Sequence, residues 1–215
     1  MLLVAGMVHA ANDTLRIACV GNSITYGHGI TNRMTNGYPA QLEQILKAPF
    51  QVRNYGFSGR TLLLKGDSPF MKETMYQDAL AYLPHVVVIK LGTNDSKPQN
   101  WKYSADFKQD LTTLVESFQK LSSKPRVFLC YPAKAFSEAW GIRDSVIFNG
   151  VIPFVQAVAK QTGCPIIDLY TPTTRVPELF PDKIHPNEAG AKLLAEVVSK
   201  ALLADKNVQS LIAKK

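Results

Sequence analysis

The chain has 215 residues, of which 46% are hydrophobic and 19% are charged, and its formal net charge is +7. This length fits one domain with a sizeable core. No apolar run reaches the roughly 18 residues that a membrane-spanning helix needs, so we expect no membrane span. The basic residues are scattered apart from the final Lys214 and Lys215, which argues against nucleic acid as a partner.

The N-terminus resembles the end of an export signal. Leu2 to Val8 form a short apolar stretch, and Val8-His9-Ala10 fits the small-residue pattern before a signal-peptidase cut, although the usual basic residues are missing. We therefore expect residues 1–11 to be a signal-peptide remnant and residues 12–215 to form a single domain. The protein is then expected in the periplasm or outside the cell. The sequence indicates no oligomeric state.

Five apolar runs predict the buried strands of a parallel sheet. The runs cover residues 15–20, 50–55, 86–91, 126–131 and 165–170. Apolar residues at helical spacing follow, most clearly over Phe107 to Leu121 and Ala189 to Leu203. This alternation predicts a three-layer α/β fold with right-handed crossovers, in which functional residues lie just after the strands, at the carboxyl edge of the sheet.

Two serines compete for the role of a nucleophile. Ser23, in Gly21-Asn22-Ser23, directly follows the first predicted strand, so we expect its hydroxyl at the carboxyl edge of the sheet. Ser68, in the segment KGDSPF, lies in a loop, and no strand leads into it. Because a serine after a strand is also a common helix cap, Ser23 needs a partner base to stand out.

Four histidines are candidates for that base. His9 lies in the expected signal remnant, and His85 directly precedes the third strand, at the far edge of the sheet. His185 is favoured because Asp182, in the segment PDKIHP, can hold its imidazole in one tautomer and stabilise its cation. Two alternatives remain: His28 as the base, although no carboxylate is near it in the sequence, and a loop that only caps the last helix.

Attack on an ester creates an oxyanion, which needs hydrogen-bond donors already aimed at it. Two segments that follow strands offer them, NYGFSG at residues 54–59 and LGTND at residues 91–95. Gly59 can bring its backbone N–H close because it has no side chain, and the Asn94 amide can donate from the side. Since glycine and asparagine also simply make turns, each segment alone is weak evidence.

Taken together, the segments GNS, SGR, GTND and DKIHP resemble, in order and spacing, the four sequence blocks of the SGNH or GDSL hydrolase family. The resemblance extends over nearly the whole chain. It implies that Ser23 is the nucleophile and that Asp182 and His185 complete a catalytic triad. It also implies an oxyanion hole made by the N–H of Ser23, Gly59 and Asn94.

The same resemblance implies a flavodoxin-like sandwich with a five-stranded parallel sheet of order 2-1-3-4-5. With that order Cys19 and Cys130 lie two strands apart, roughly 10 Å, which is too far for a disulfide. Cys130 and Cys164 fall at opposite ends of neighbouring strands, so we expect three free thiols. The cysteines also lack metal-ligand spacing, and we expect neither a metal nor another cofactor. Asn22 replaces the aspartate common in the family, a departure outside the triad.

Three longer stretches point to a substrate class. KLGTNDSKPQNW, FLCYPAKAF and LFPDKIHPNEAGAKL are similar to small bacterial esterases described as sialate O-acetylesterase-like or acetylxylan esterase-like. This resemblance implies removal of acetyl groups from carbohydrate hydroxyls. Trp101 and Trp140 follow the third and fourth strands, so they either stack on sugar rings or pin their loops to the core. The alternatives are a lysophospholipase or thioesterase with a longer acyl preference, and a carbohydrate-binding domain without catalysis.

Overall fold

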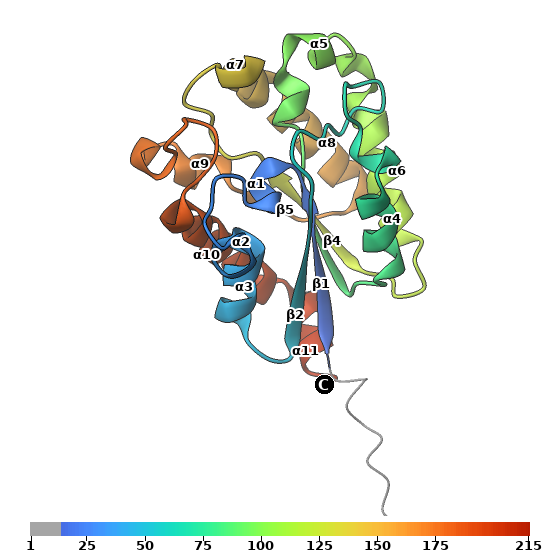
Figure 1. Cartoon of the computed structure of the whole chain (residues 1–215). Coiled ribbons are helices and arrows are strands. Elements are labelled where there is room, and N and C mark those ends of the chain that lie inside the picture. The colour runs from blue at the N-terminus through green and yellow to red at the C-terminus, as the bar shows by residue number, and fades with distance from the viewer. Residues whose placement is uncertain (1–13) are drawn as a thin grey trace, which may run out of the picture.

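The chain forms a five-stranded parallel sheet with helices on both faces (Figure 1). The structure is a computed structural model and describes residues 14–215, so the predicted signal remnant lies outside the described residues. The strands are β1 (Leu15–Gly21), β2 (Phe50–Gly56), β3 (Val86–Lys90), β4 (Arg126–Tyr131) and β5 (Ile166–Asp168). Their order is β2-β1-β3-β4-β5, and every neighbouring pair is parallel, which confirms the predicted fold.

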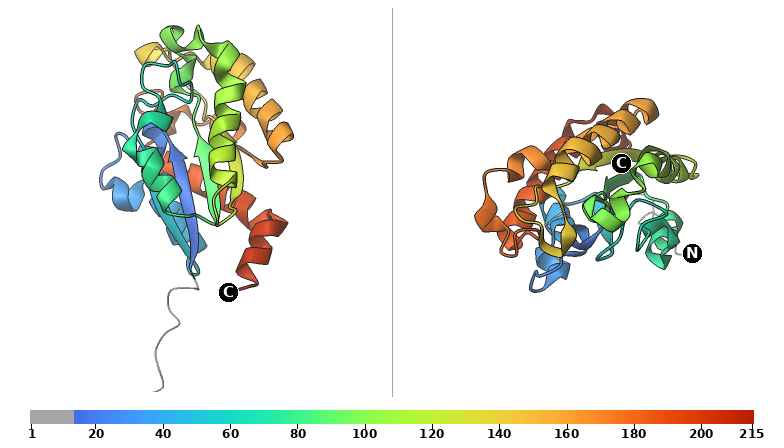
Figure 2. Two further views of the ribbon diagram at one scale, coloured as in Figure 1. Left: turned by 90° about the vertical axis from the view of Figure 1, so that its right-hand side faces the viewer. Right: turned by 90° about the horizontal axis from the view of Figure 1, so that it is seen from above.

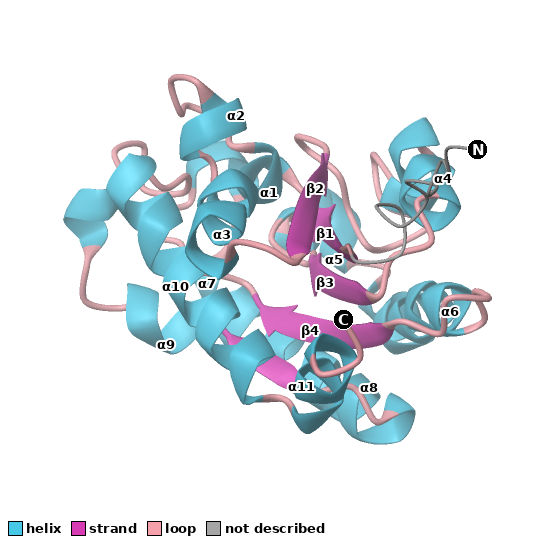
Figure 3. Ribbon diagram, turned by 90° about the horizontal axis from the view of Figure 1, so that it is seen from below, coloured by secondary structure: helices cyan, strands magenta, loops and turns pink. Residues whose placement is uncertain are grey.

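Two helix layers cover the sheet, as Figures 2 and 3 show from three further directions. One face carries α3 (Tyr38–Leu46), α10 (Glu188–Ala204) and α11 (Lys206–Ile212), and the other carries α4 (Thr74–Ala81), α6 (Phe107–Gln119) and α8 (Ile152–Thr162). Shorter helices lie in the connections: α1 (Ser23–Tyr26), α2 (Arg33–Asn36), α5 (Pro98–Trp101), α7 (Asp144–Val146) and α9 (Tyr170–Thr173). The helices predicted from the clearest apolar spacing correspond to α6 and α10.

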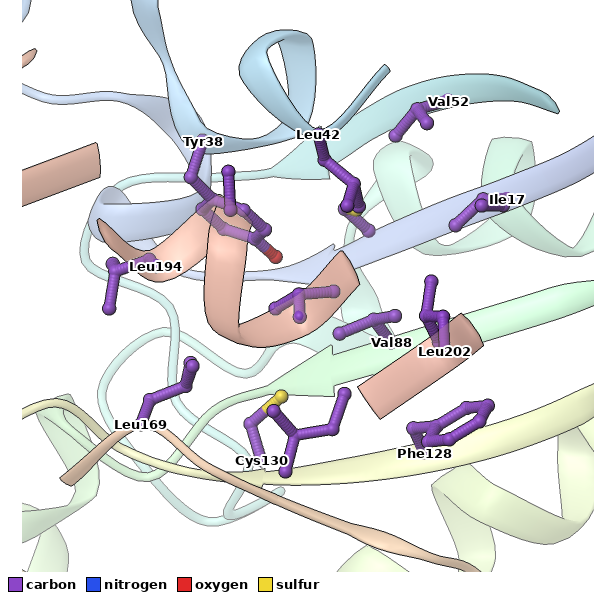
Figure 4. Close-up of a cluster of buried hydrophobic side chains, with 14 of the residues drawn as sticks. Ile17, Tyr38, Leu42, Val52, Val88, Phe128, Cys130, Leu169, Leu194 and Leu202 are labelled. Carbon is purple, nitrogen blue, oxygen red and sulfur yellow. The ribbon is translucent and has the colours of Figure 1, made fainter. Parts of the chain in front are cut away.

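Neighbouring strand residues enter separate hydrophobic clusters on the two faces of the sheet. Ile17 and Val88 pack with α3 and α10 in the first cluster (Figure 4), whereas Val87 and Ile89 pack with α6 and α8 in the second. Because both faces of the central strands are buried, these strands are continuously apolar rather than alternating. The three cysteines are buried in the same clusters as free thiols.

The strand register brings the carboxyl ends of three strands together. Gly21 pairs with both Gly56 and Lys90, so the loops after β1, β2 and β3 leave the sheet side by side. A Cβ on Gly56 would lie 2.2 Å from the backbone nitrogen of Tyr26. Only glycine therefore lets α1 pack against the end of β2.

The fifth strand is shorter than predicted. The apolar run over residues 165–170 predicted a strand that reaches Tyr170, but β5 ends at Asp168. The Oδ1 atom of Asp168 accepts the N–H groups of Tyr170 and Thr171, both at 2.9 Å. A side-chain acceptor at this position starts a helix in place of further strand, and α9 follows.

One described stretch, Ala139–Thr162, is long and apolar enough by composition to cross a membrane. Its helical path is interrupted, because Ile142 and Arg143 have extended backbone and Ile147–Val151 forms a π-helix before α8. The buried side chains of α8 join the second hydrophobic cluster. This packing gives α8 the role of a layer helix in the α/β fold.

Candidate active site

Ser23 begins α1 immediately after β1. A Cβ on Gly21 would lie 2.1 Å from Thr25 Oγ1, so the tight turn out of the strand requires glycine. Asn22 caps the helix, since its Oδ1 accepts the N–H of Ile24 at 3.2 Å. The turn therefore presents Ser23 at the carboxyl edge of the sheet, where the sequence predicted it.

Ser23, His185 and Asp182 form a continuous chain of hydrogen bonds. His185 Nε2 lies 2.8 Å from Ser23 Oγ, and His185 Nδ1 lies 2.7 Å from Asp182 Oδ2. Ser23 is 9% exposed and His185 is 8% exposed, so neither is fully enclosed. This arrangement lets His185 take the proton of Ser23 while Asp182 stabilises the imidazolium that forms.

Asp182 is fixed by the turn that it shares with His185. Its Oδ1 accepts the N–H of Ile184 at 2.9 Å and the N–H of His185 at 2.6 Å, and Lys183 adopts a left-handed conformation with φ of 69°. Asn187 caps α10 independently. Helix capping and the hydrogen bond to the imidazole are thus made by different side chains, which argues against a loop that only caps the helix.

Burial and hydrogen bonding set the protonation states of the pair. Partial burial alone would raise the pKa of Asp182, but the N–H groups of His185 and Ile184 and the imidazole together hold it below its ordinary value. Burial lowers the pKa of His185, and Asp182 offsets only part of this effect. Electrostatic interaction with His28 and Lys90 lowers the pKa of His185 further. The imidazole is therefore neutral at neutral pH and can accept a proton.

His28, which the sequence left open as an alternative base, also lies at the site. Its ring centroid lies 4.5 Å from that of His185, and ligand atoms of His28, Asp182 and His185 lie within 4.8 Å of one another. Such a group can hold a metal ion. However, Asp182 and Ser23 already engage both ring nitrogens of His185, so a metal would have to break the hydrogen-bond chain. The geometry favours proton transfer by His185 over metal binding.

N–H donors for an oxyanion lie on the loops beside Ser23, whose own N–H is in the unpaired first turn of α1. Gly59 has a φ of 83°, and its N–H has no acceptor within residues 14–215. A Cβ at Gly59 would meet nothing within 4 Å, so this backbone faces open space. Asn94 Nδ2 donates to Arg60 O at 3.0 Å, which ties the two donor loops together and leaves a second amide hydrogen to donate.

Asp95 and Asn100 hold the same loops, and the sequence analysis gave them no role. Asp95 is fully buried and accepts the N–H of Leu62 at 3.1 Å and of Leu63 at 2.8 Å. Burial raises the pKa of Asp95 to about 6, against the effect of these bonds. Asn100 Nδ2 donates to Asn94 O at 2.9 Å. A carboxylate directly after Asn94 was the sequence signal that could have found Asp95.

Ser68 lies in a loop with a structural role. Its carbonyl accepts the N–H of Thr61 at 2.9 Å. The preceding Asp67 exchanges two hydrogen bonds with Asn100, at 2.9 and 3.1 Å. In the part of the chain that the structure describes, no histidine bonds to the Ser68 hydroxyl. The segment KGDSPF therefore braces the loop after β2 against the loop after β3.

The structure separates the two tryptophans. Trp140 is 56% exposed, its ring centroid lies 5.4 Å from that of His185, and its backbone is left-handed with φ of 54°. Trp101 instead packs with its ring 5.8 Å from Phe154 and 5.9 Å from Phe107, at the border of the second hydrophobic cluster. These contacts favour a structural role for Trp101 and leave Trp140 as the aromatic side chain at the site.

Sequence comparison relates the chain to a known family and to a curated protein. Residues 19–193 match the GDSL-like Lipase/Acylhydrolase family. The chain is 46% identical over 208 residues to an acetylxylan esterase of Xylanibacter ruminicola, and the match covers 88% of this chain and 43% of that protein. The chain thus spans less than half the length of this relative.

Solved structures share the fold. An acetyl xylan esterase, AlAXEase, superposes with a TM-score of 0.68 at 20% identity, covering 87% of this chain and 99% of that chain. A carbohydrate acetylesterase from Sinorhizobium meliloti gives a TM-score of 0.69 at 17% identity, covering 89% and 99%. A lipase/acylhydrolase from Enterococcus faecalis gives 0.70 at 22% identity, covering 88% and 95%. Because the family match spans most of the sequence, including Ser23, Asp182 and His185, the chain belongs to the GDSL-like lipase/acylhydrolase family.

Proposed function

We propose that this protein is a serine esterase that removes acetyl groups from carbohydrate hydroxyls through an acyl-enzyme on Ser23. The observation that carries this proposal is the hydrogen-bond chain from Ser23 Oγ through His185 to Asp182. The substrate class is supported by the 46% identity with an acetylxylan esterase, within the part that the two proteins share.

The geometry supports a two-step reaction. Ser23 Oγ attacks the acetyl carbonyl carbon while His185 Nε2 takes the serine proton, and the carbonyl oxygen becomes an oxyanion. The N–H groups of Ser23, Gly59 and Asn94 stabilise that oxyanion. His185 then gives its proton to the sugar oxygen, which leaves as a hydroxyl. A water molecule deprotonated by His185 then attacks the acetyl-serine, and His185 returns the proton to Ser23 Oγ as acetate is released.

Acetate release from acetylated xylan and from other acetylated glycans tests this proposal, together with p-nitrophenyl esters of increasing length. We expect release of acetate that Ser23→Ala abolishes. Activity should fall from acetyl through butyryl to octanoyl esters, because a site that fits the acetyl group of the proposed substrate does not favour longer acyl chains. An optimum at octanoyl would favour the lysophospholipase or thioesterase alternative, and glycan binding without acetate release would favour a binding domain.

Trp140 supports a carbohydrate as the alcohol side of the ester. An exposed indole beside His185 offers a flat apolar face to a sugar ring, and a non-glycine residue in the left-handed region is the kind of strain that persists at functional sites. Trp140→Ala should therefore lower kcat/KM for acetylated xylan oligosaccharides between about twofold and about tenfold. Its kcat/KM for p-nitrophenyl acetate should stay unchanged. Equal losses on both substrates would assign Trp140 to loop structure instead.

We also propose export to the periplasm or the extracellular space. Support comes from the apolar stretch Leu2 to Val8 and from the Val8-His9-Ala10 pattern. Expression of the full chain in a bacterium, followed by N-terminal sequencing, tests this part. A mature protein that begins near Ala11 is the expected result, and an uncut protein in the cytoplasm contradicts it.

A further inference from the structure

Lys90 is buried beneath the turn that carries Ser23. It is the last residue of β3 and is 0% exposed. Its Nζ donates to Asn22 Oδ1 at 3.1 Å and to Thr93 Oγ1 at 3.4 Å. Lys90 therefore joins the residue that precedes Ser23 to the residue that precedes Asn94.

No acidic partner explains a lysine at this place. Among the ion pairs formed by residues 14–215, none includes Lys90, and both of its acceptors are neutral. Burial lowers the pKa of Lys90 to about 7, as expected for an ammonium without a counter-charge. The titratable groups that face it are the Cys130 thiol on β4 and the imidazole of His185.

Asn22 connects the lysine to the helix that holds the nucleophile. One oxygen, Asn22 Oδ1, accepts both the N–H of Ile24 and the Nζ of Lys90. The other end of the amide, Asn22 Nδ2, has no partner within the described residues. Loss of the Lys90 bond would leave Asn22 Oδ1 held by the N–H of Ile24 alone. The cap of α1 could then move, and the Ser23 hydroxyl would move with it.

We propose that Lys90 is a positioning residue of the esterase, which holds the turns that carry Ser23 and Asn94 in place through Asn22 and Thr93. This inference rests on the proposed function, because it gives Lys90 a task in the same reaction. Lys90 also has an electrostatic effect that does not depend on its hydrogen bonds, because its charge lowers the pKa of His185.

The test compares Lys90→Met with Lys200→Met, which alters an exposed lysine on α10. Methionine keeps an unbranched side chain and removes both the hydrogen bonds and the charge. The measured quantity is the rate at which a fluorophosphonate labels Ser23 as a function of pH, because labelling requires the activated serine and no particular substrate.

Lys90→Met should lower the plateau labelling rate on the order of 10²-fold, the effect of a misplaced reacting group. It should also move the acidic limb of the pH profile upward, because the Lys90 charge lowers the pKa of His185. Lys200→Met should match the unmodified protein in both quantities. A lysine that only filled space would leave the midpoint of the limb unchanged.

Asn22→Ser provides a second variant if circular dichroism shows that Lys90→Met does not fold. Serine caps a helix about as well as asparagine but is too short to reach Lys90 Nζ, so labelling should again slow. An unchanged rate and midpoint in a folded variant would overturn the inference alone, because the unmodified protein is labelled. No labelling of the unmodified protein would overturn the proposed function, and this inference with it.

Discussion

Ser23 and Ser68 differ in the contacts that they make. Ser23 Oγ is 2.8 Å from His185 Nε2, whereas Ser68 contributes its backbone to a loop. Ser23→Ala should therefore lower kcat for acetyl ester hydrolysis on the order of 10⁴-fold or more, while Ser68→Ala should change it little. Steady-state kinetics on p-nitrophenyl acetate measure both. Comparable losses in the two variants would remove the assignment of Ser23 as nucleophile.

We expect the protonation of His185 to set the acidic limb of the pH profile. His185 must be neutral to take the serine proton, and its pKa lies below the ordinary value of 6.5. The kcat/KM should thus reach its maximum at pH values above the pKa of His185. It should fall as pH falls through that pKa, with a midpoint below about 6.5. A pH profile on p-nitrophenyl acetate measures this midpoint, and His185→Ala should abolish most activity.

His28 serves as the control for that profile. Electrostatic interaction with His28 lowers the pKa of His185, so His28→Ala should keep the activity and move the midpoint slightly upward. If His28→Ala abolished the acidic limb while His185→Ala preserved it, the roles of the two histidines would be reversed.

Of these residues, the sequence could predict those whose partners lie close to them along the chain. Asp182 and His185 lie in one turn, so their hydrogen bond depends on local backbone geometry that the order of residues already indicates. The partners of Lys90 and Asp95 are different, because Asn22 and the N–H of Leu62 lie far away in the sequence. Such contacts join segments that become neighbours only when the sheet has formed, and the order of residues along the chain does not indicate them.

Asp95 joins two elements of the site, the loop after β2 and the loop after β3. Asp95→Ala would leave the buried N–H groups of Leu62 and Leu63 without acceptors, and each unsatisfied group costs about 1–3 kcal/mol. The free energy of unfolding and kcat should both fall, since the two loops carry Gly59 and Asn94. Urea unfolding and steady-state kinetics measure the two effects.

Asp106→Ala is the matched control for that change. The carboxylate of Asp106 makes an ion pair with Lys65 in which both side chains are substantially exposed, and solvent screening leaves such pairs with little effect on stability. Asp106→Ala should therefore leave kcat unchanged and stability nearly so. If Asp95→Ala behaved like this control, the buried carboxylate would not hold the loops together.

Burial on both faces explains how well the strands could be predicted. The apolar runs located β1 to β4 to within about one residue. Residues of β1, β3 and β4 enter both hydrophobic clusters, so these strands are almost continuously apolar, whereas the edge strand β2 exposes Gln51 and Arg53 and alternates. The run that predicted β5 was equally apolar, but Asp168 bonds to the backbone ahead of it and ends the strand. Side-chain acceptors compete with strand pairing, and an apolar pattern does not reveal which of the two prevails.

At the scale of the whole molecule, buried Lys90 should make stability depend on pH. Its pKa is about 7 in the folded protein and 10.5 as an ordinary lysine, so between these values the unfolded chain binds the extra proton. The protein is therefore most stable, as far as Lys90 is concerned, above the pKa of the lysine in the unfolded chain. This stability decreases as pH falls and is lost once pH has fallen through about 7. The free energy of unfolding should thus rise with pH by up to about 1.4 kcal/mol per pH unit.

At higher pH, buried thiols make the free energy of unfolding fall as pH rises, which is opposite to the effect of Lys90. Burial raises the pKa of Cys19 to about 12, so the folded protein keeps a proton that the unfolded chain loses above about pH 8.5. The free energies of unfolding should therefore be compared between about pH 7 and about pH 8.5. The quantity to follow is the difference between the unmodified protein and Lys90→Met, because the contributions of the thiols to the two proteins largely cancel. Urea unfolding should show this difference growing in favour of the unmodified protein as pH rises. Lys200→Met should run parallel to the unmodified protein, and a Lys90→Met curve that also ran parallel would mean that the folded protein keeps Lys90 charged.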